Sequence, residues 1–435
     1  MRDDALNFSF TVAISFYVKK GIGEKALYLR EKYKRSVSNA KNDMEKGVKS
    51  ERLLSVDIMR GITVAGMILV NNPGSWGHVY APLRHAVWNG LTPTDLVFPF
   101  FMFIMGVSMC LSMSKKGFKA DGKAVLKMLK RFVLIFLIGV ALGWLGTFCG
   151  RLAWGPAEGE QLPLWARIIN AANSFDTIRI LGVLPRLALC YLFGSIIVMA
   201  FRPKTVVWIS AGLLAVYSVI LIFGNGYEFS ESNVLYVVDH YVLGEKHLYR
   251  DSVDGVTLAF DPEGLLGTLP SVAHVLIGFC CGLLLIKKDD KKTKALNLFT
   301  VGSLLAIAGF LLSYGLPLNK KIWSPTFVLT TCGMASCVLA LLTVSIDIRG
   351  HRKGWWPAEV FGVNPLALYV LSDVLAILFG TVKIGGSTIG GSVYEGLCAI
   401  IPSPHAASLA FALLFVALNW AVGYVLYKRK IYIKL

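Results

Sequence analysis

The sequence predicts an all-α integral membrane protein, a polytopic bundle of ten or eleven transmembrane helices. Three observations lead to this fold class. Of the 435 residues, 55% are hydrophobic and only 16% are charged, whereas soluble proteins carry about 25% charged residues. The mean hydropathy is +0.60. Apolar runs recur along most of the chain, and their length of about 20 residues is what an α-helix needs to cross a bilayer.

Each expected span is an apolar run bounded by charged residues or by glycine and proline. In chain order the ten runs are 54–71, 96–113, 129–149, 180–201, 205–223, 270–286, 296–316, 327–346, 360–379 and 406–427. Residues 6–18 are apolar but short, and they follow two aspartates where a signal peptide carries basic residues. They are therefore either an eleventh span or an artefact of a start site assigned upstream of the true one. Residues 389–401 are also too short to cross, which favours a re-entrant or surface segment.

Basic residues alternate between the connections and predict the orientation of these helices. On alternate connections, 33 of the 44 Lys and Arg residues fall on one side and eight on the other. Basic loops are retained in the cytoplasm, so residues 19–52 and the C-terminus are expected to be cytoplasmic. We expect a protein of a bacterial inner membrane, with a basic N-terminal segment (residues 1–50) and a membrane-embedded domain (residues 51–435).

The net charge of +17 is explained by this orientation. Basic nucleic-acid-binding proteins carry their charge on a soluble, charge-rich surface, so no nucleic-acid partner is expected. The eight cysteines lie in or beside apolar segments without metal-type spacing. We expect neither a disulfide framework nor a metal.

The opposite face carries four long loops, residues 72–94, 150–178, 224–269 and 380–405. They are rich in Trp, Gly, Pro and His, which suits a binding site at one membrane face. The first loop contains His85, whose imidazole can take a proton if it is held neutral. Asn71 precedes this loop and is close enough along the chain to donate a hydrogen bond to a developing oxyanion.

Several charged or ionisable residues fall inside the predicted spans, where charge is costly. Asp57 and Arg60 share a helix face, so they form either a local ion pair or a cavity wall at which Arg60 meets an anionic ligand. Arg186 either pairs with a carboxylate on another helix or also faces an anion. Asp373 and His274 are further ionisable residues with no partner evident from the sequence.

Seven sequence motifs together resemble one known family. In chain order they are R-L-L-S-V-D-I-M-R-G (52–61), V-N (70–71), H-A-V-W-N-G-L-T (85–92), D-L-V-F-P-F-F-M-F-I-M-G (95–106), G-V-L-P-R-L (182–187), D-P-E-G-L-L-G-T (261–268) and N-K-K-I-W-S (319–324). This pattern resembles the transmembrane acetyltransferases of the heparan-α-glucosaminide N-acetyltransferase family and its bacterial relatives. Residues 1–50 show no family pattern, and the long N-terminal lumenal domain of the lysosomal enzyme is missing.

The resemblance implies transfer of the acetyl group of cytosolic acetyl-CoA to the amine of a glucosamine-type sugar on the non-cytoplasmic side. His85 matches the active-site histidine of the family, and Asn71 matches its partner asparagine. His85 is expected to act as a general base during direct attack on the thioester, and a ping-pong route through an acetylated His85 stays open. Because the lumenal domain is missing, heparan sulfate itself is not the expected acceptor.

Coenzyme A is long and polyanionic, so this reaction needs positive charge inside the bundle. Arg60 and Arg186 are the candidates for binding its phosphates, since a guanidinium suits phosphate. Trp88 and Asn89, beside His85, are expected to contact the acceptor sugar. Asp261 and Glu263 either bind a protonated amino sugar or stabilise a helix N-terminus.

Two other functions stay open at this stage. One keeps the fold and the donor but acetylates a hydroxyl of a cell-envelope glycan. The other is a secondary transporter of a sugar, although such proteins often contain internal repeats and none stands out here. The expected partners are the lipid bilayer and a small amino-sugar or glycan acceptor, and a homodimer is left open.

Overall fold

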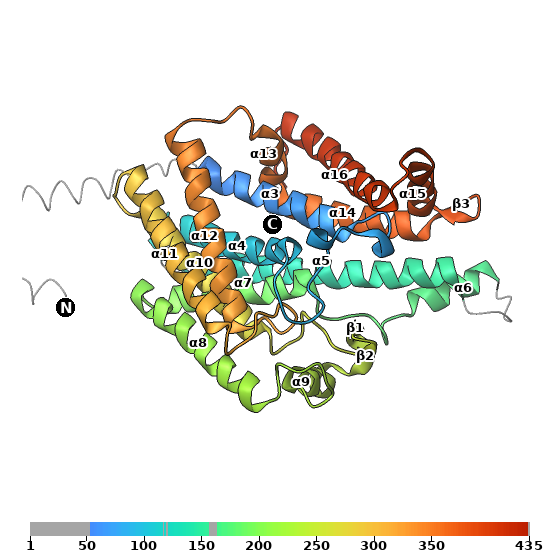
Figure 1. Cartoon of the computed structure of the whole chain (residues 1–435), viewed down its shortest axis with the longest axis horizontal. Helices are drawn as coiled ribbons and strands as arrows, with labels where there is room; N and C mark the ends of the chain where they lie inside the picture. Colours follow the sequence, from blue (N-terminus) through green and yellow to red (C-terminus); the bar gives the residue numbers. More distant parts are fainter. Residues whose placement is uncertain (1–52, 116, 119–120, 156–162, 434–435) are drawn as a thin grey trace, which may run out of the picture. The chain divides into compact units, whose positions relative to one another are not determined.

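The helices of the protein lie close to the predicted spans (Figure 1). The computed structural model describes residues 53–115, 117–118, 121–155 and 163–433. Within these residues, nine helices are long and apolar enough to cross a membrane. They are α3 (Leu54–Asn71), α4 (Val97–Ser114), α5 (Gly122–Trp154), α7 (Val183–Ala200), α8 (Pro203–Phe223), α10 (Thr268–Ile286), α11 (Lys291–Leu312), α12 (Pro325–Leu342) and α16 (Pro404–Lys428). The predicted all-α membrane fold is confirmed, whereas the segments 1–50 and 6–18 lie outside the described residues.

The ninth predicted span, residues 360–379, is interrupted by a sharp bend, and its two parts together are long and apolar enough to form one broken span. It is a pair of helices, α13 (Trp356–Val363) and α14 (Pro365–Thr381), bent by 86°. Pro365 causes the break, because proline lacks an N–H and disfavours helical geometry in the residue before it. That residue, Asn364, is buried, and its side-chain amide donates to the carbonyl of Ile431 and accepts from the N–H of Ile433, both at 2.8 Å. The chain that follows α16 is thereby held against the break.

Segments expected as loops contain shorter elements. Three short helices are α6 (Leu164–Ala172), α9 (Val234–Leu243) and α15 (Ile389–Ile400). Two hairpins pair β1 (Asp251–Val253) with β2 (Val256–Leu258) and β3 (Lys383–Ile384) with β4 (Ser387–Thr388). Single turns of 3₁₀-helix are η1 (Trp76–His78), η2 (Ala81–Leu83), η3 (Pro93–Leu96) and η4 (Glu245–His247), and η5 (Thr343–Ile348) is a π-helix that extends α12. Helix α15 matches the segment predicted to be too short to cross.

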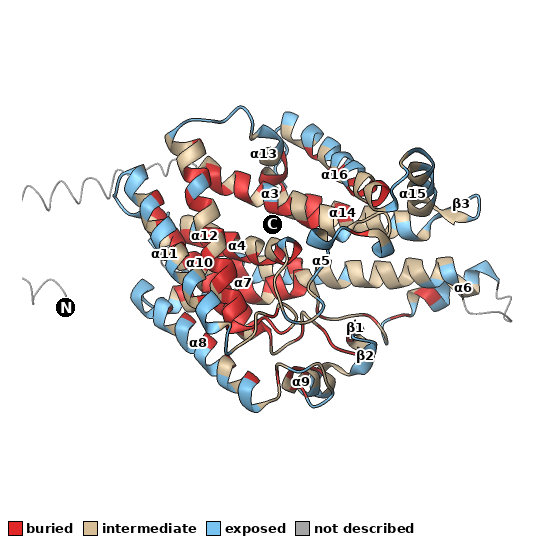
Figure 2. Cartoon of the chain, viewed as in Figure 1, coloured by how far each residue is buried: buried red, intermediate tan, exposed pale blue. Residues whose placement is uncertain are grey.

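Four helices, α3, α4, α10 and α12, form the buried centre of the bundle, whereas α5, α8, α11 and α16 expose apolar side chains at its outside (Figure 2). Small residues let the central backbones approach closely. A Cβ placed on Gly106 of α4 would lie 2.0 Å from the carbonyl oxygen of Val275 in α10, and one on Gly61 of α3 would overlap the carbonyl of Ala358 in α13. The central helices therefore hold the segments at their ends in defined positions.

Candidate active site

His85 is paired with a buried aspartate from the start of the next helix. Its Nδ1 lies 2.6 Å from Oδ1 of Asp95, in η3. The second carboxylate oxygen, Oδ2, accepts from the backbone N–H groups of Ala86 at 3.1 Å and Thr92 at 3.0 Å. The Asp95 side chain is 1% exposed and that of His85 is 43% exposed. A fixed carboxylate thus orients an imidazole that a substrate can still reach.

A lysine from a distant part of the chain completes this group. The Nζ of Lys320 lies 3.0 Å from Nδ1 and 3.3 Å from Nε2 of His85, and 3.6 Å from Oδ1 of Asp95. Burial lowers the pKa of Lys320, although the charge of Asp95 acts in the opposite direction. Asp95, His85 and Lys320 are called the site triad below.

Residues 318–324 form a tight turn that is docked on the loop carrying His85. The N–H of Gly90 donates to the carbonyl of Leu318 at 2.7 Å, and the Asn319 amide donates to Oδ1 of Asn89 at 3.2 Å. The Asn319 side chain also accepts from the N–H of Ile322 inside the turn. Asn89, predicted to bind the sugar, therefore contacts the Lys320 turn, and the sequence motif alone did not indicate this contact.

Trp88 is half-buried and makes contacts within the protein. Its indole N–H donates to the carbonyl of Tyr227 at 2.7 Å, and its ring contacts Phe229 and Phe260 at centroid distances of 5.2 and 5.5 Å. This packing anchors the His85 loop on the 227–260 segment. The predicted contact of Trp88 with a sugar stays a prediction.

Asn71 lies at the last turn of α3 and is exposed. Within the ranges that the structure describes, no hydrogen bond joins it to His85. The partners of His85 are instead Asp95 and Lys320. Both of these residues occur in the recognised motifs, but nothing in the sequence showed that they meet.

Asp261 and Glu263 share a single arginine. Arg179 donates to both oxygens of Asp261, at 2.8 and 2.5 Å, and to Glu263 at 2.5 Å. Burial raises the pKa of Glu263, but the charges of Arg179, Arg186 and Lys320 outweigh burial and hold the pKa below its ordinary value. Glu263 therefore lies within electrostatic range of the site triad, and its charge is largely balanced by protein cations.

The two predicted phosphate-binding arginines occupy different regions. Arg186 is 1% exposed and donates from Nη2 to the carbonyl of Gly264 at 2.7 Å, just before α10. Arg60 donates to Asp57 at 3.0 Å, to Ser108 at 2.6 Å and to the carbonyl of Gly362, at the break between α13 and α14, at 3.2 Å. The local ion pair considered for Arg60 is present, and Arg186 is bonded to a carbonyl.

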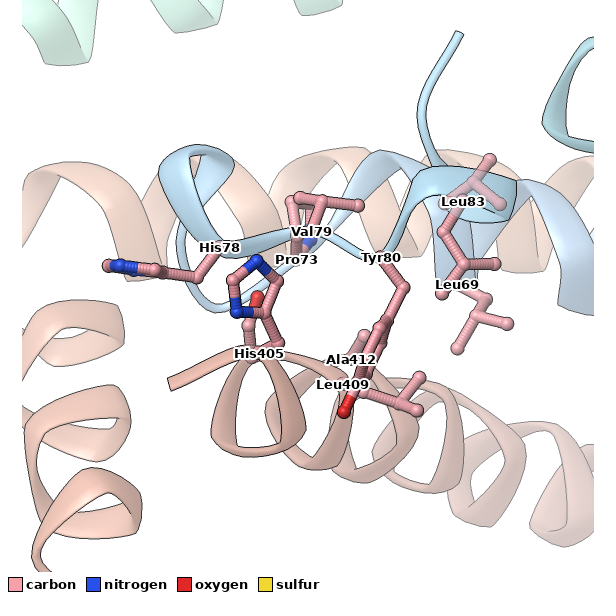
Figure 3. A pocket seen from close by; sticks show the side chains of 11 residues that line it. Leu69, Pro73, His78, Val79, Tyr80, Leu83, His405, Leu409 and Ala412 are labelled. Atoms are coloured by element: carbon pink, nitrogen blue, oxygen red, sulfur yellow. The ribbon is translucent and has the colours of Figure 1, made fainter. Parts of the chain in front are cut away.

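A surface hollow lies between the loop after α3 and the start of α16 (Figure 3). The His405 ring lies between His78 and Tyr80, with ring centroids 5.4 and 5.5 Å away. The hydroxyl of Tyr394 lies 3.1 Å from Nδ1 of His78. His85 does not line this hollow. In the part of the chain that the structure covers, no group of three or more His, Cys, Asp or Glu residues is arranged to hold a metal.

Comparisons with known proteins agree with the membrane fold. A family model described as an acyltransferase domain matches residues 53–427. The chain is 27% identical over 443 residues to the heparan-alpha-glucosaminide N-acetyltransferases of Mus musculus and of Homo sapiens. The alignments cover 89% and 88% of this chain and 61% and 60% of those proteins. The chain thus spans about three fifths of the length of these curated relatives.

Proposed function

Because this chain belongs to the acyltransferase-domain family of membrane proteins, we propose that it transfers the acetyl group of acetyl-CoA to the amine of a glucosamine-type sugar. The observation that carries the proposal is the site triad. A partly exposed imidazole is fixed by a buried carboxylate, and a primary amine, that of Lys320, already lies against Nε2 of the ring. The site therefore accommodates an amine next to a candidate base.

His85 is the proposed base. When the Nδ1–H donates to Asp95, the lone pair of Nε2 is left to accept a proton. Lys320 supplies positive charge beside the buried Asp95 carboxylate, so the imidazole does not have to carry that charge itself. The acceptor amine approaches Nε2 while the Lys320 cation stays beside Nδ1 and Asp95.

The chemical step is direct acyl transfer. The amine nitrogen attacks the thioester carbonyl carbon, the new C–N bond forms and the C–S bond breaks. The proton lost by the amine passes to Nε2 of His85 and then to the departing thiolate, which leaves as free CoA. Acetylation of Nε2 itself, followed by transfer to the amine, uses the same residue in two steps.

The donor and the acceptor are proposed to meet across the membrane. The basic connections favour a cytoplasmic position for the end of the bundle at which α3 begins, and Arg60 lies near that end. Arg60 is proposed to contact the phosphates of CoA, and Asn71 to contact a ligand at the other end of α3. The His85 loop then faces the non-cytoplasmic side of a bacterial inner membrane.

Release of free CoA by the purified protein in lipid nanodiscs tests this function. We expect acetyl-CoA to be consumed with glucosamine and not with N-acetylglucosamine, whose amine is blocked. Mass spectrometry should find one acetyl group on the sugar nitrogen. H85A should be inactive and remain folded. Saturable sugar uptake into vesicles without CoA release from any amino sugar would refute the proposal in favour of a transporter.

A further inference from the structure

A second polar group lies close to the site triad and is entirely enclosed. It consists of Arg186 from α7, Trp323 from the turn before α12, and Thr268 at the start of α10. Arg186 and Trp323 are each 1% exposed and Thr268 is 7% exposed. The guanidinium carbon of Arg186 lies 5.7 Å from the centroid of the Trp323 ring. We call these three residues the inner donor group.

The inner donor group carries several hydrogen-bond donors without a protein acceptor. Within the described ranges, Nε and Nη1 of Arg186, Nε1 of Trp323 and Oγ1 of Thr268 are buried and have no hydrogen-bond partner. Leaving a buried donor unpaired is unfavourable, so most buried polar atoms in proteins are paired. Tyr217 shows the usual case, since its buried hydroxyl donates to the carbonyl of Ile322.

The backbone of Trp323 is also held in an unfavourable conformation. Its φ is +54°, in the left-handed region that a bulky side chain rarely occupies. The conformation is maintained by the bonded turn around it, in which the Trp323 N–H donates to the carbonyl of Lys320 at 3.0 Å. The strained backbone of Trp323 thus accompanies an indole that is buried beside Arg186.

The position of Trp323 relates the inner donor group to the site triad. Trp323 follows Lys320 by three residues in a hydrogen-bonded turn, and its ring contacts that of Phe98 at 5.4 Å. Phe98 follows Asp95 by three residues. Trp323 is therefore linked to both partners of His85. It lies three residues after Lys320, and its ring contacts a residue that lies three residues after Asp95.

The charges around Arg186 indicate which kind of acceptor the group suits. Asp239 and Glu263 both lie within electrostatic range of its guanidinium, whereas its hydrogen bond in the described ranges is to the Gly264 carbonyl. The Glu263 carboxylate, whose pKa is held below its ordinary value, repels a phosphate dianion placed beside Arg186. The unpaired N–H groups suit a neutral carbonyl oxygen on which negative charge develops during a reaction.

We propose that Trp323 Nε1 and the unpaired edge of Arg186 bind the thioester carbonyl oxygen of the acetyl donor and stabilise the oxyanion formed on it. This inference rests on the proposed function. An attacking amine has to lie about 3–3.5 Å from the carbonyl carbon and within hydrogen-bond reach of His85. In this arrangement the carbonyl oxygen accepts from Trp323 Nε1, in the turn of Lys320, and from the unpaired edge of Arg186, which lies over the Trp323 ring.

W323F tests the inference, because it keeps an aromatic ring between Arg186 and Phe98 and removes only the N–H donor. W420F is the matched control, since it removes an indole N–H that already donates to the Pro357 carbonyl at 3.1 Å, away from the site triad. We expect W323F to lower kcat about 10- to 100-fold and to raise the KM for acetyl-CoA about five- to tenfold, because the same N–H binds the carbonyl of the bound donor. W420F should retain kcat and KM within threefold. R186K, which keeps the charge and loses the unpaired N–H edge, should behave like W323F and serves as the second variant if W323F does not fold.

A binding measurement separates this inference from the proposed reaction. The probe is a thioether ketone analogue of acetyl-CoA, which keeps the carbonyl and cannot transfer the acetyl group, compared with free CoA, which has no carbonyl. The wild-type protein should bind the ketone about five- to tenfold more tightly than CoA, and W323F should lose this preference. An unchanged preference in both W323F and R186K would overturn the inference and leave the group with an internal structural role. A wild-type protein that shows the preference but acetylates no amino sugar would overturn the proposed acceptor and keep this site.

Discussion

Lys320 lies 3.0 Å from Nδ1 and 3.3 Å from Nε2 of His85, although 235 residues separate them in the sequence. The contact exists because the turn before α12 is bonded to the loop between α3 and α4 through Gly90 and Asn89. It places a cation beside the buried Asp95 carboxylate and an amine beside the proposed base. The roles of these residues can be tested one at a time.

Replacing Lys320 with methionine should lower the rate of CoA release at pH 7 at least about tenfold. The buried Asp95 carboxylate loses the Lys320 cation at 3.6 Å, and the imidazole is left to supply the charge in place of accepting a proton. K320R keeps the charge and should retain most of the activity. Equal rates for K320M and K320R would contradict this role of the lysine charge.

Replacing Asp95 with asparagine should lower kcat by about 10²- to 10⁴-fold, because an amide no longer holds the Nδ1–H of His85 in one orientation. The KM for acetyl-CoA should change little, since both carboxylate oxygens of Asp95 are already bonded to His85 and to the backbone of its own loop. Steady-state kinetics in nanodiscs separates the two constants. A D95N protein with a normal kcat and a raised KM would show that Asp95 acts on binding.

Asn71 and Asn72 provide a matched pair for the predicted contact with a ligand. Asn71 is exposed, whereas Asn72 caps α3 through a 2.8 Å bond from its amide to the Ile68 carbonyl. N71A should reduce turnover about 10- to 100-fold without loss of stability, if its amide serves a reacting group. N72A should cost about 1 kcal/mol of stability and keep turnover. Normal turnover in N71A would remove Asn71 from the site.

Replacing Arg60 with glutamine should raise the KM for acetyl-CoA about tenfold, because its guanidinium is proposed to contact the phosphates of the donor. The control substrate is the acetyl thioester of N-acetylcysteamine, which has no phosphate. Its kinetic constants should be the same in wild type and R60Q. If both thioesters lose activity equally, Arg60 acts through the packing of α3 against α13.

Asp239 should make the stability of the protein depend on pH. Burial raises the pKa of its carboxyl from 3.8 to about 7. The folded state therefore binds the proton more tightly than the unfolded state, and this stabilisation is lost as the pH rises through about 7. D239N keeps an oxygen to accept from the Leu265 N–H, the present partner of Asp239 at 2.8 Å.

Thermal unfolding in detergent at several pH values checks this prediction. D239N should unfold a few degrees higher than wild type at pH 8, and the difference should shrink towards pH 5. E228Q serves as the control, because Glu228 is an exposed carboxylate in the segment just before α9. A difference between D239N and wild type that is constant over this pH range would contradict the assignment.

The sequence by itself determined the membrane fold and, within the described residues, the approximate positions of the nine long apolar helices. A transmembrane helix satisfies its backbone hydrogen bonds internally and needs only a sufficient apolar length, so each span is encoded locally. The break at Asn364 was visible as an Asn-Pro pair, but its 86° angle also depends on the buried contact of Asn364 with the chain after α16. The family resemblance identified His85, but only the structure showed that Asp95 and Lys320 are its neighbours.

Only the tertiary structure decided which side chains meet. Lys320 contacts His85, and Arg186 lies over the ring of Trp323. Arg179 forms ion pairs with Asp261 and Glu263. These contacts form because packing of the central helices holds the segments at the helix ends in place. Such contacts join residues far apart in the chain, and no local pattern of hydrophobicity or charge encodes their distances. The sequence therefore marked the motifs that carry chemistry, and the packing of the bundle determined how they are combined.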